Sequence, residues 1–177
     1  MTQKRPQTGE YAPFYAGYIA RVPEGDLLAI LESGYEDWKR VLGALTESQA
    51  DYRYEPSKWS IKEVVGHVTD TERIFAYRLL RIARGDQTPL SGFEQDDYVR
   101  EGYFSGRRLA DLLAEFGAVR RATTILLRSI PDQIWMRRGI ANQKEVTVTA
   151  LAFIIAGHEL HHRTILEERY LPALPKS

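Results

Sequence analysis

The sequence predicts an all-α protein, an antiparallel four-helix bundle with an extended N-terminal arm. Four long stretches carry apolar residues every three or four positions, which is the period of an amphipathic helix. No stretch alternates apolar and polar residues in the manner of a half-buried strand. The chain has 177 residues, about one domain's worth, and its connections are short to moderate. A bundle is the simplest way to bury four apolar helix faces against one another.

The first 22 residues differ from the rest of the chain. They are rich in Tyr, Gly and Pro and show no helical or strand period. We expect residues 1–22 to form an extended arm that lies over the bundle through Phe14, Tyr15 and Tyr18. Residues 23–177 then form the bundle domain itself.

The first two helices have recognisable start signals. Residues 26–45 form the first predicted helix, because apolar residues recur along one face and Asp26 can cap its N-terminus. Ser60 and Glu63 have the Ser-x-x-Glu spacing of a capping box, which marks the start of the second helix. We expect the second helix to continue to residue 84, with Gly85 as its C-terminal glycine.

The second half of the chain supplies two more helices. Residues 86–104 are expected to form a loop, and a loop of this length inside a domain is often functional. The third helix is expected at residues 105–129. Residues 131–146 are expected to be irregular, and residues 147–170 to form the last helix.

Composition and charge restrict the partners. Lys and Arg together number 24, as do Asp and Glu, so the chain lacks the basic excess of a nucleic-acid-binding protein. The absence of cysteine excludes disulfides, thiolate metal sites and cysteine nucleophiles. The longest apolar stretch, Val148 to Gly157, is too short to cross a bilayer, and Met1 to Arg21 shows no secretory signal. We therefore expect a cytoplasmic protein that binds neither nucleic acid nor membrane.

The histidines form the clearest candidate site. His158 and His162 lie about 40° apart on the apolar face of the last helix, and such an i, i+4 pair can chelate one divalent ion. His67 lies at the edge of the second helix's apolar stripe and can supply a third ligand, as in zinc sites that keep one position open. Buried imidazoles without a metal are costly when charged and difficult to satisfy when neutral. A metal-free bundle with buried imidazoles remains the alternative interpretation.

Residues 158–162 also match the H-E-x-x-H pattern of zinc metalloproteases, in which Glu159 would be the general base. The longer metzincin pattern needs Gly and His where this chain has Ile165 and Glu168, so a peptidase is not favoured. Glu159 and His162 form half of a ferritin-like di-metal motif. The chain offers no second Glu-x-x-His for the other half.

Other polar residues are candidates for supporting roles. Asp70 could orient an imidazole as a hydrogen-bond acceptor, or it could be an exposed helix carboxylate. Arg73 and Arg163 could bind an anionic substrate, although surface ion pairs are the simpler interpretation. The predicted 86–104 loop could cover the site. Three of its residues are further candidates: Asp96, Asp97 and Tyr98.

Two segments, residues 59–67 and 157–163, resemble the DinB-like (DinB/YfiT) family of metal-binding four-helix-bundle proteins. Residues 93–98 and 109–116 resemble it more weakly, and the similarity extends over residues 25–170. The resemblance implies one divalent metal, zinc or nickel, held by three histidines. By motif position these ligands are His67, His158 and His162, whereas His161 is not a ligand. Many members of the family form homodimers.

The resemblance also implies two kinds of chemistry. Some relatives are thiol-dependent transferases or isomerases that use bacillithiol, mycothiol or glutathione as a low-molecular-weight thiol, and others are described as metal-dependent hydrolases of small substrates. Thiol transfer is slightly preferred for this chain, with Glu159 as the candidate catalytic base. At about 100° from His158 on the helix, Glu159 could also face away from the metal. A non-catalytic, metal-stabilised bundle that serves as a binding or stress protein is the alternative.

Overall fold

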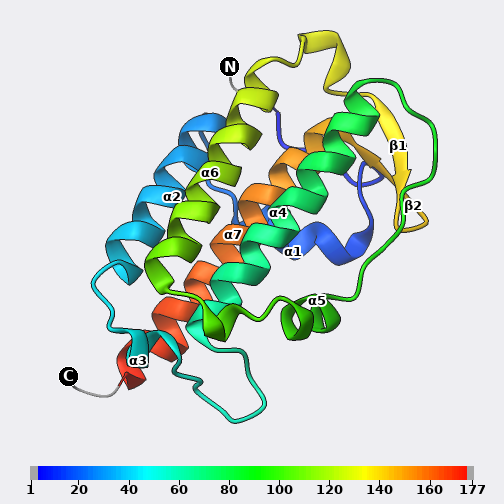
Figure 1. The fold of residues 1–177 in the computed structure, drawn as a ribbon. Helices are drawn as coiled ribbons and strands as arrows, with labels where there is room; N and C mark the ends of the chain where they lie inside the picture. Colours follow the sequence, from blue (N-terminus) through cyan, green and yellow to red (C-terminus); the bar gives the residue numbers. More distant parts are fainter. Residues whose placement is uncertain (1–3, 175–177) are drawn as a thin grey trace.

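The computed structural model describes residues 4–174, and four long helices form its bundle (Figure 1). These are α2 (Leu27–Leu42), α4 (Ile61–Ala83), α6 (Leu109–Arg128) and α7 (Val148–Ile165). Helices α2 and α4 each pack against both α6 and α7, so α2 lies diagonally opposite α4. The predicted four-helix bundle is confirmed.

The helices do not all run antiparallel to their neighbours. Glu47, just after α2, accepts a hydrogen bond from the Leu109 backbone N–H at the start of α6, at 3.1 Å. The same carboxylate pairs with Lys62 at the start of α4, at 2.9 Å. Helices α4 and α6 therefore begin at the same end of the bundle and run parallel (Figure 1). The antiparallel arrangement holds for α2 with α6 and for α4 with α7.

Local sequence signals account for the helix ends. Asp26 accepts hydrogen bonds from the backbone N–H groups of Leu28 and Ala29. Ser60 and Glu63 form the expected capping box, with the Ser60 backbone N–H 2.6 Å from the Glu63 carboxylate. Gly85 follows α4 at a φ of +85°, a left-handed conformation that favours glycine. All three predicted caps are confirmed.

The N-terminal arm is not extended over its whole length. Residues Pro13–Tyr15 form a 3₁₀ turn, and α1 (Ala16–Arg21) packs along α7. Six residues are too few to display a helical period, and such a short helix depends on tertiary contacts for its stability. Residues 1–3 of the expected arm lie outside the described residues.

The two regions predicted to be irregular also contain regular structure. Within residues 86–104, α5 (Gln95–Glu101) forms one short helix. Strands β1 (Arg138–Ala141) and β2 (Lys144–Thr147) form an antiparallel hairpin whose turn places Asn142 and Gln143 at φ values of +49° and +62°. The sequence lacks the Asn-Gly pair that usually announces such a turn. The remaining short elements are α3 (Glu47–Ala50), the 3₁₀ turns Phe104–Gly106, Asp132–Ile134 and Leu171–Ala173, and the π turn Leu166–Tyr170.

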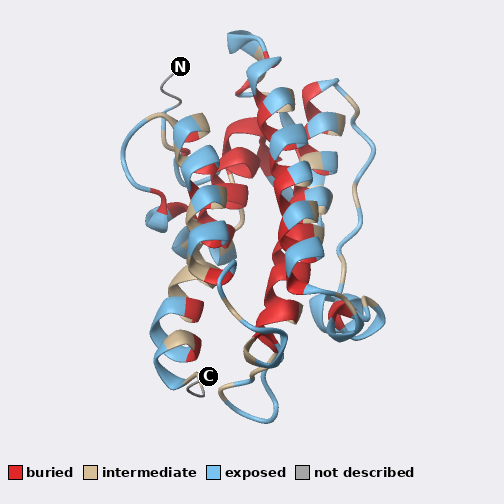
Figure 2. Cartoon of the chain, turned by 60° about the vertical axis from the view of Figure 1, so that its left-hand side comes forward, coloured by how far each residue is buried: buried red, intermediate tan, exposed pale blue. Residues whose placement is uncertain are grey.

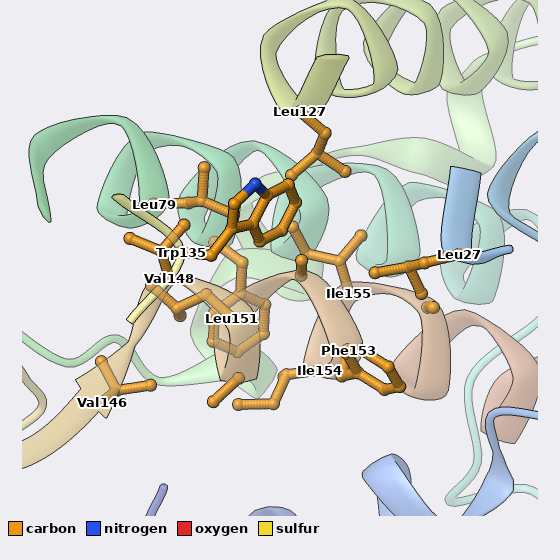
Figure 3. Packing of buried hydrophobic residues seen from close by; sticks show 14 of the residues in the cluster. Leu27, Leu79, Leu127, Trp135, Val146, Val148, Leu151, Phe153, Ile154 and Ile155 are labelled. Atoms are coloured by element: carbon orange, nitrogen blue, oxygen red, sulfur yellow. The ribbon is translucent and has the colours of Figure 1, made fainter. Parts of the chain in front are cut away.

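The core consists of two apolar clusters at opposite ends of the bundle. Leu79, Leu127, Trp135 and Leu151 belong to the cluster next to the hairpin (Figure 3). Trp38 belongs to the cluster at the α5 end. The buried residues line the inside of the four helices, whereas the outer faces are exposed (Figure 2). Among residues 4–174, no helix combines the length and the apolar run needed for a membrane crossing.

A layer of buried polar residues separates the two clusters. It contains a group of histidines between α4 and α7, and a group of charged residues between α2, α4, α6 and α7. Its fully buried members are His67, Glu72, Arg120, His158 and Glu159. Burying so many polar groups is costly unless they are paired or serve a function, so this layer is the candidate site.

Candidate metal centre

Three histidines converge in the polar layer. His67 comes from α4, and His158 and His162 come from successive turns of the antiparallel helix α7. One ring nitrogen from each lies within 4.8 Å of the others. The closest approach is 3.1 Å, between Nε2 of His67 and Nε2 of His158. The arrangement expected from the sequence is therefore present.

The site keeps these histidines neutral. His67 and His158 are 3% and 5% exposed, whereas His162 is the most accessible of the three. Burial lowers the pKa of His67 to about 4, and His161 lowers it further. Burial, followed by repulsion from neighbouring histidines, holds the pKa values of His158 and His162 well below the usual range. A neutral imidazole has a free nitrogen lone pair, which is the form that binds metal.

The spacing of the three histidines fits one divalent ion. The nitrogen ligands of a tetrahedral zinc ion lie about 3.4 Å apart, given Zn–N bonds of about 2.0–2.1 Å. The observed spacing brackets this value, with one pair at 3.1 Å and none beyond 4.8 Å. The donor set is also suitable, because neutral imidazoles bind zinc, nickel, copper and iron.

A neighbouring hydroxyl can orient His67. The Thr71 Oγ1 atom lies 3.5 Å from Nδ1 of His67, at the outer limit of a hydrogen bond. If Nδ1 donates its proton to this oxygen, Nε2 is left free to bind a metal. Asp70 does not have the expected orienting role, because its carboxylate points outward and pairs with Arg73 at 3.0 Å.

A cavity of about 240 Å³ opens beside His67 and His158. Aromatic side chains form much of its wall, and Arg78 and Asn142 add polar groups. The aromatic residues are Phe14, Tyr15, Tyr18, Phe75 and Phe93. A second cavity, of about 320 Å³, reaches His162 from the other side and is bordered by Trp59 and Asp96. The histidines thus form a partition between two cavities.

Aromatic rings cover the histidines on both sides. The Tyr18 ring of α1 lies edge-on to His158, with ring centroids 5.4 Å apart. The Trp59 ring lies 4.6 Å from the His67 ring and stacks near His162 at 6.4 Å. These rings limit access of water to the nitrogen atoms and explain the lowered pKa values of the histidines.

Glu159 does not join the histidines. Its carboxylate accepts a hydrogen bond from Trp38 Nε1 at 2.6 Å and lies 3.6 Å from Arg120. It contributes to neither cavity wall. Successive helix residues point about 100° apart, so the neighbour of His158 faces α2 and α6 instead. This placement gives Glu159 no contact with the site, and we do not assign it as a base.

The charged residues around Glu159 form a buried network. Arg120 binds the Glu72 carboxylate through two of its nitrogens, with the shortest contact at 2.8 Å. Burial raises the pKa of Glu159, and Arg120 opposes this rise. Oε2 of Glu159 is the one buried side-chain nitrogen or oxygen atom among residues 4–174 without a hydrogen-bond partner. The network joins α2, α4, α6 and α7 and has a structural role.

The other candidates lie at the surface or in the second cavity. Arg73 pairs with Asp70 and Glu115, and Arg163 pairs with Asp37 at 2.6 Å, so both form ion pairs and neither reaches the histidines. The three loop candidates lie in different surroundings. Asp96 borders the second cavity, Asp97 pairs with Arg100, and the Tyr98 ring is 47% exposed.

Sequence reasoning missed Arg78, although a signal for it exists. Arg78 lies 11 residues after His67. In an α-helix that spacing is three turns and about 20°, so the two residues share one helix face. Phe75 of the same helix also lines the cavity. Residues 93–95 belong to the loop expected to cover the site, and they line the first cavity.

Comparison with known proteins gives one family match. A sequence model of the DinB superfamily matches residues 30–166, which is most of the chain. No curated protein matches the sequence significantly.

Two solved structures share the fold. YfiT from Bacillus subtilis aligns with a TM-score of 0.74 at 20% identity, over 91% of this chain and 92% of that chain. It is described as "a probable metal-dependent hydrolase with an unusual four-helix bundle topology". A mycothiol-dependent maleylpyruvate isomerase aligns with a TM-score of 0.66 at 12% identity, over 89% of this chain and 66% of that chain. At such identities the likeness shows a common fold.

Proposed function

Because this chain belongs to the DinB superfamily, we propose that it is a metal-dependent enzyme whose divalent ion is held by His67, His158 and His162. The observation that carries the proposal is the convergence of three neutral imidazoles, of which His67 and His158 line one cavity and His162 lines the other. When bound, the metal supplies a Lewis acid that lowers the pKa of a ligated thiol or water and so activates it. Zinc and nickel are the proposed metals.

The chain's own residues prepare the site. Thr71 lies within reach of Nδ1 of His67 and orients that ring. Tyr18 and Trp59 cover the imidazoles and restrict the entry of water. A water-poor cavity strengthens electrostatic interactions between the site and a small-molecule substrate.

We propose a thiol-dependent transfer in preference to hydrolysis. The first cavity offers no buried carboxylate as a general base, because the only acidic residue lining it, among residues 4–174, is the exposed Glu94. Hydrolysis would therefore depend on the metal alone to activate water. A thiol needs only to lose its proton to become a strong nucleophile. The chain has no cysteine, so the thiol would be a low-molecular-weight cofactor. The mycothiol-dependent isomerase among the structural neighbours supports this choice.

Metal content is the first test of the proposal. Purified protein loaded with zinc or nickel and then dialysed should contain about one metal ion per chain, measured by mass spectrometry. His67→Ala, His158→Ala and His162→Ala should each lose it. His161→Ala is the matched control, because His161 lies on the same helix turn but outside the three-histidine group. If the wild-type protein contains no zinc or nickel after loading at neutral pH, the proposal is refuted.

Activity is the second test. The zinc- and nickel-loaded protein would be assayed with glutathione, bacillithiol and mycothiol against a chromogenic electrophile, and separately with esters and amides. Thiol-dependent turnover that is lost in His162→Ala, with the fold retained, would support the transferase. Turnover of esters without thiol would favour the hydrolase. A metal that raises the melting temperature without any turnover would favour the non-catalytic, metal-stabilised bundle.

Three further proposals concern assembly, location and domain division. The family resemblance implies a homodimer, and the sequence pattern implies action in the cytoplasm and an arm at residues 1–22 separate from the domain at residues 23–177. Light scattering tests the dimer, and cell fractionation tests the location. A chain without residues 1–22 that folds and binds metal would support the division.

A further inference from the structure

Arg78 is a buried cation without an acidic partner. It is 3% exposed, and no carboxylate among residues 4–174 forms an ion pair with it. The other buried arginine, Arg120, binds Glu72 through two nitrogens. A buried charge is costly unless something compensates for it, so the lack of a partner at Arg78 needs an explanation.

Arg78 has donors to spare. One nitrogen donates to the Ser91 backbone carbonyl at 2.5 Å, and the guanidinium also interacts with the Tyr15 hydroxyl. A guanidinium has five N–H donors in all. None of its nitrogens is both fully buried and unbonded. Arg78 lines the first cavity, so its remaining donors are available to a ligand there.

The surroundings of Arg78 suit an anionic group with an apolar body. The guanidinium lies 5.4 Å from the centroid of the Phe75 ring and 5.8 Å from that of Phe93. Burial lowers the pKa of Arg78, yet an arginine keeps its charge in proteins. Planar guanidinium donors match a carboxylate in a two-point arrangement. Glu94, on the exposed side of the same cavity, makes no ion pair with Arg78.

Arg78 and the histidines lie at different places along one cavity. Arg78 lies 11 residues after His67, which corresponds to about 16 Å of helix rise, and side chains on a helix lean toward its N-terminus. The guanidinium therefore extends back toward the histidines. A ligand that touches both must carry its anionic group several bonds away from the end that faces the histidines. The volume of about 240 Å³ is small for a ligand site, so the ligand is also small.

We propose that Arg78 is the anion-binding residue of this cavity, and that the ligand is a small organic acid whose carboxylate binds Arg78 while its other end faces His67 and His158. The orientation of the far end rests on the proposed function, but the binding of the carboxylate does not. The carboxylate belongs either to the substrate or to the thiol cofactor.

Three probes with the same six-carbon chain test the inference. Hexanoate has the carboxylate, hexanamide replaces it with a neutral group, and 6-mercaptohexanoate adds a thiol at the far end. Binding would be measured by calorimetry or ligand-observed NMR, on metal-free and zinc-loaded protein. Arg78→Gln removes the charge and Arg78→Lys keeps it. Arg84→Gln is the matched control, because Arg84 is an exposed arginine at the end of the same helix.

Wild-type protein should bind hexanoate at least about tenfold more tightly than hexanamide, as expected for charge-assisted hydrogen bonds. Arg78→Gln should lose this preference and still take up zinc, Arg78→Lys should keep part of it, and Arg84→Gln should leave it unchanged. If zinc loading tightens the binding of 6-mercaptohexanoate in wild-type protein but not in Arg78→Gln, the carboxylate is assigned to the thiol cofactor. If zinc tightens the binding of 6-mercaptohexanoate equally in both proteins, the carboxylate is assigned to the substrate.

Other results would overturn the inference. Equal binding of hexanoate and hexanamide to wild-type protein would do so, as would unchanged hexanoate binding in a folded Arg78→Gln protein. If Arg78→Gln does not fold, the hexanoate–hexanamide difference in wild-type protein and its weakening by salt decide the question. Failure of zinc uptake with normal hexanoate binding would refute the proposed function and leave this inference standing.

Discussion

The Nε2 atoms of His67 and His158 lie 3.1 Å apart, although 91 residues separate the two histidines in the chain. A neutral imidazole has one donor and one acceptor nitrogen. Without metal, this contact joins a donor to an acceptor, which requires different tautomers on the two rings. A divalent ion removes that requirement, because both nitrogens can then present lone pairs to the same ion.

The metal-free protein should lose stability in mild acid. The pKa of His67 is about 4 in the folded protein, against about 6.5 in an unfolded chain. Between these values the unfolded state binds more protons, so stability present above pH 6.5 is lost as the pH falls toward 4. His67 alone contributes about 3 kcal/mol to this loss. Urea unfolding at pH 7.5, 5.5 and 4.5 measures it.

The control for this acid effect is His67→Gln, in which one titrating group is removed. Its free energy of unfolding should depend less on pH than that of wild-type protein over the same range. An identical pH dependence in the two proteins would contradict the assignment of the acid effect to His67.

Glu159 should prove structural and not catalytic. Glu159→Gln keeps an oxygen that can accept the Trp38 hydrogen bond, so metal content and activity should stay near wild-type values. Loss of a general base would cost roughly 10²–10⁴ in rate. Assays of the zinc-loaded variant distinguish the two cases, and a loss of that size would restore the role expected from the sequence.

Arg120→Met should destabilise the bundle far more than Glu159→Gln. It leaves the buried carboxylates of Glu72 and Glu159 without their shared cation. Breaking a buried ion pair in this way costs about 3–5 kcal/mol. Urea unfolding of both variants at neutral pH gives the comparison, and equal stabilities would show that Arg120 is not the stabilising member of the network.

Gly157→Ala should detach α1 from the bundle. A Cβ at Gly157 would collide with the backbone carbonyl of Tyr18, which cannot rotate away as a side chain can. Overpacking of this kind costs about 1–3 kcal/mol, and hydrogen exchange of α1 should become faster. Gly17→Ala is the matched control, since its Cβ would meet nothing within 4 Å. That change should be neutral or stabilise by about 0.5–1 kcal/mol.

Trp59 should report metal binding. Its ring lies 4.6 Å from the ring of His67, so nickel, which quenches nearby fluorophores, should reduce its emission. Trp59→Phe should remove most of this quenching. Trp135→Phe should retain it, because Trp135 lies in the apolar cluster next to the hairpin. Quenching that survives in Trp59→Phe would place the bound nickel elsewhere.

The features that could be predicted from the sequence are those encoded locally. The caps at Asp26 and Ser60 depend on side chains within three residues of the N–H groups that they satisfy. The pairing of His158 with His162 follows from helix geometry alone. Addition of His67 needed only the assumption that α4 faces α7, which the structure confirms.

The features that could not be predicted depend on which elements become neighbours. An amphipathic pattern shows which face of α6 is buried, but not whether α6 runs parallel or antiparallel to α4. The charge of Arg78 on the buried face of α4 has no explanation until the cavity is known. Likewise, Gln143 adopts a left-handed conformation that glutamine rarely takes, so the hairpin turn lacked its usual signal.

The parallel run of α4 and α6 has a consequence for how the cavity wall can change as the sequence diverges among relatives. A connection between parallel helices must return along the bundle, about 30 Å for the 20 residues of α6. Here that connection passes beside the histidines and places Phe93, Glu94 and Gln95 in the cavity wall. Mutations in this segment can reshape the wall while α4 and α7 hold the histidines in place.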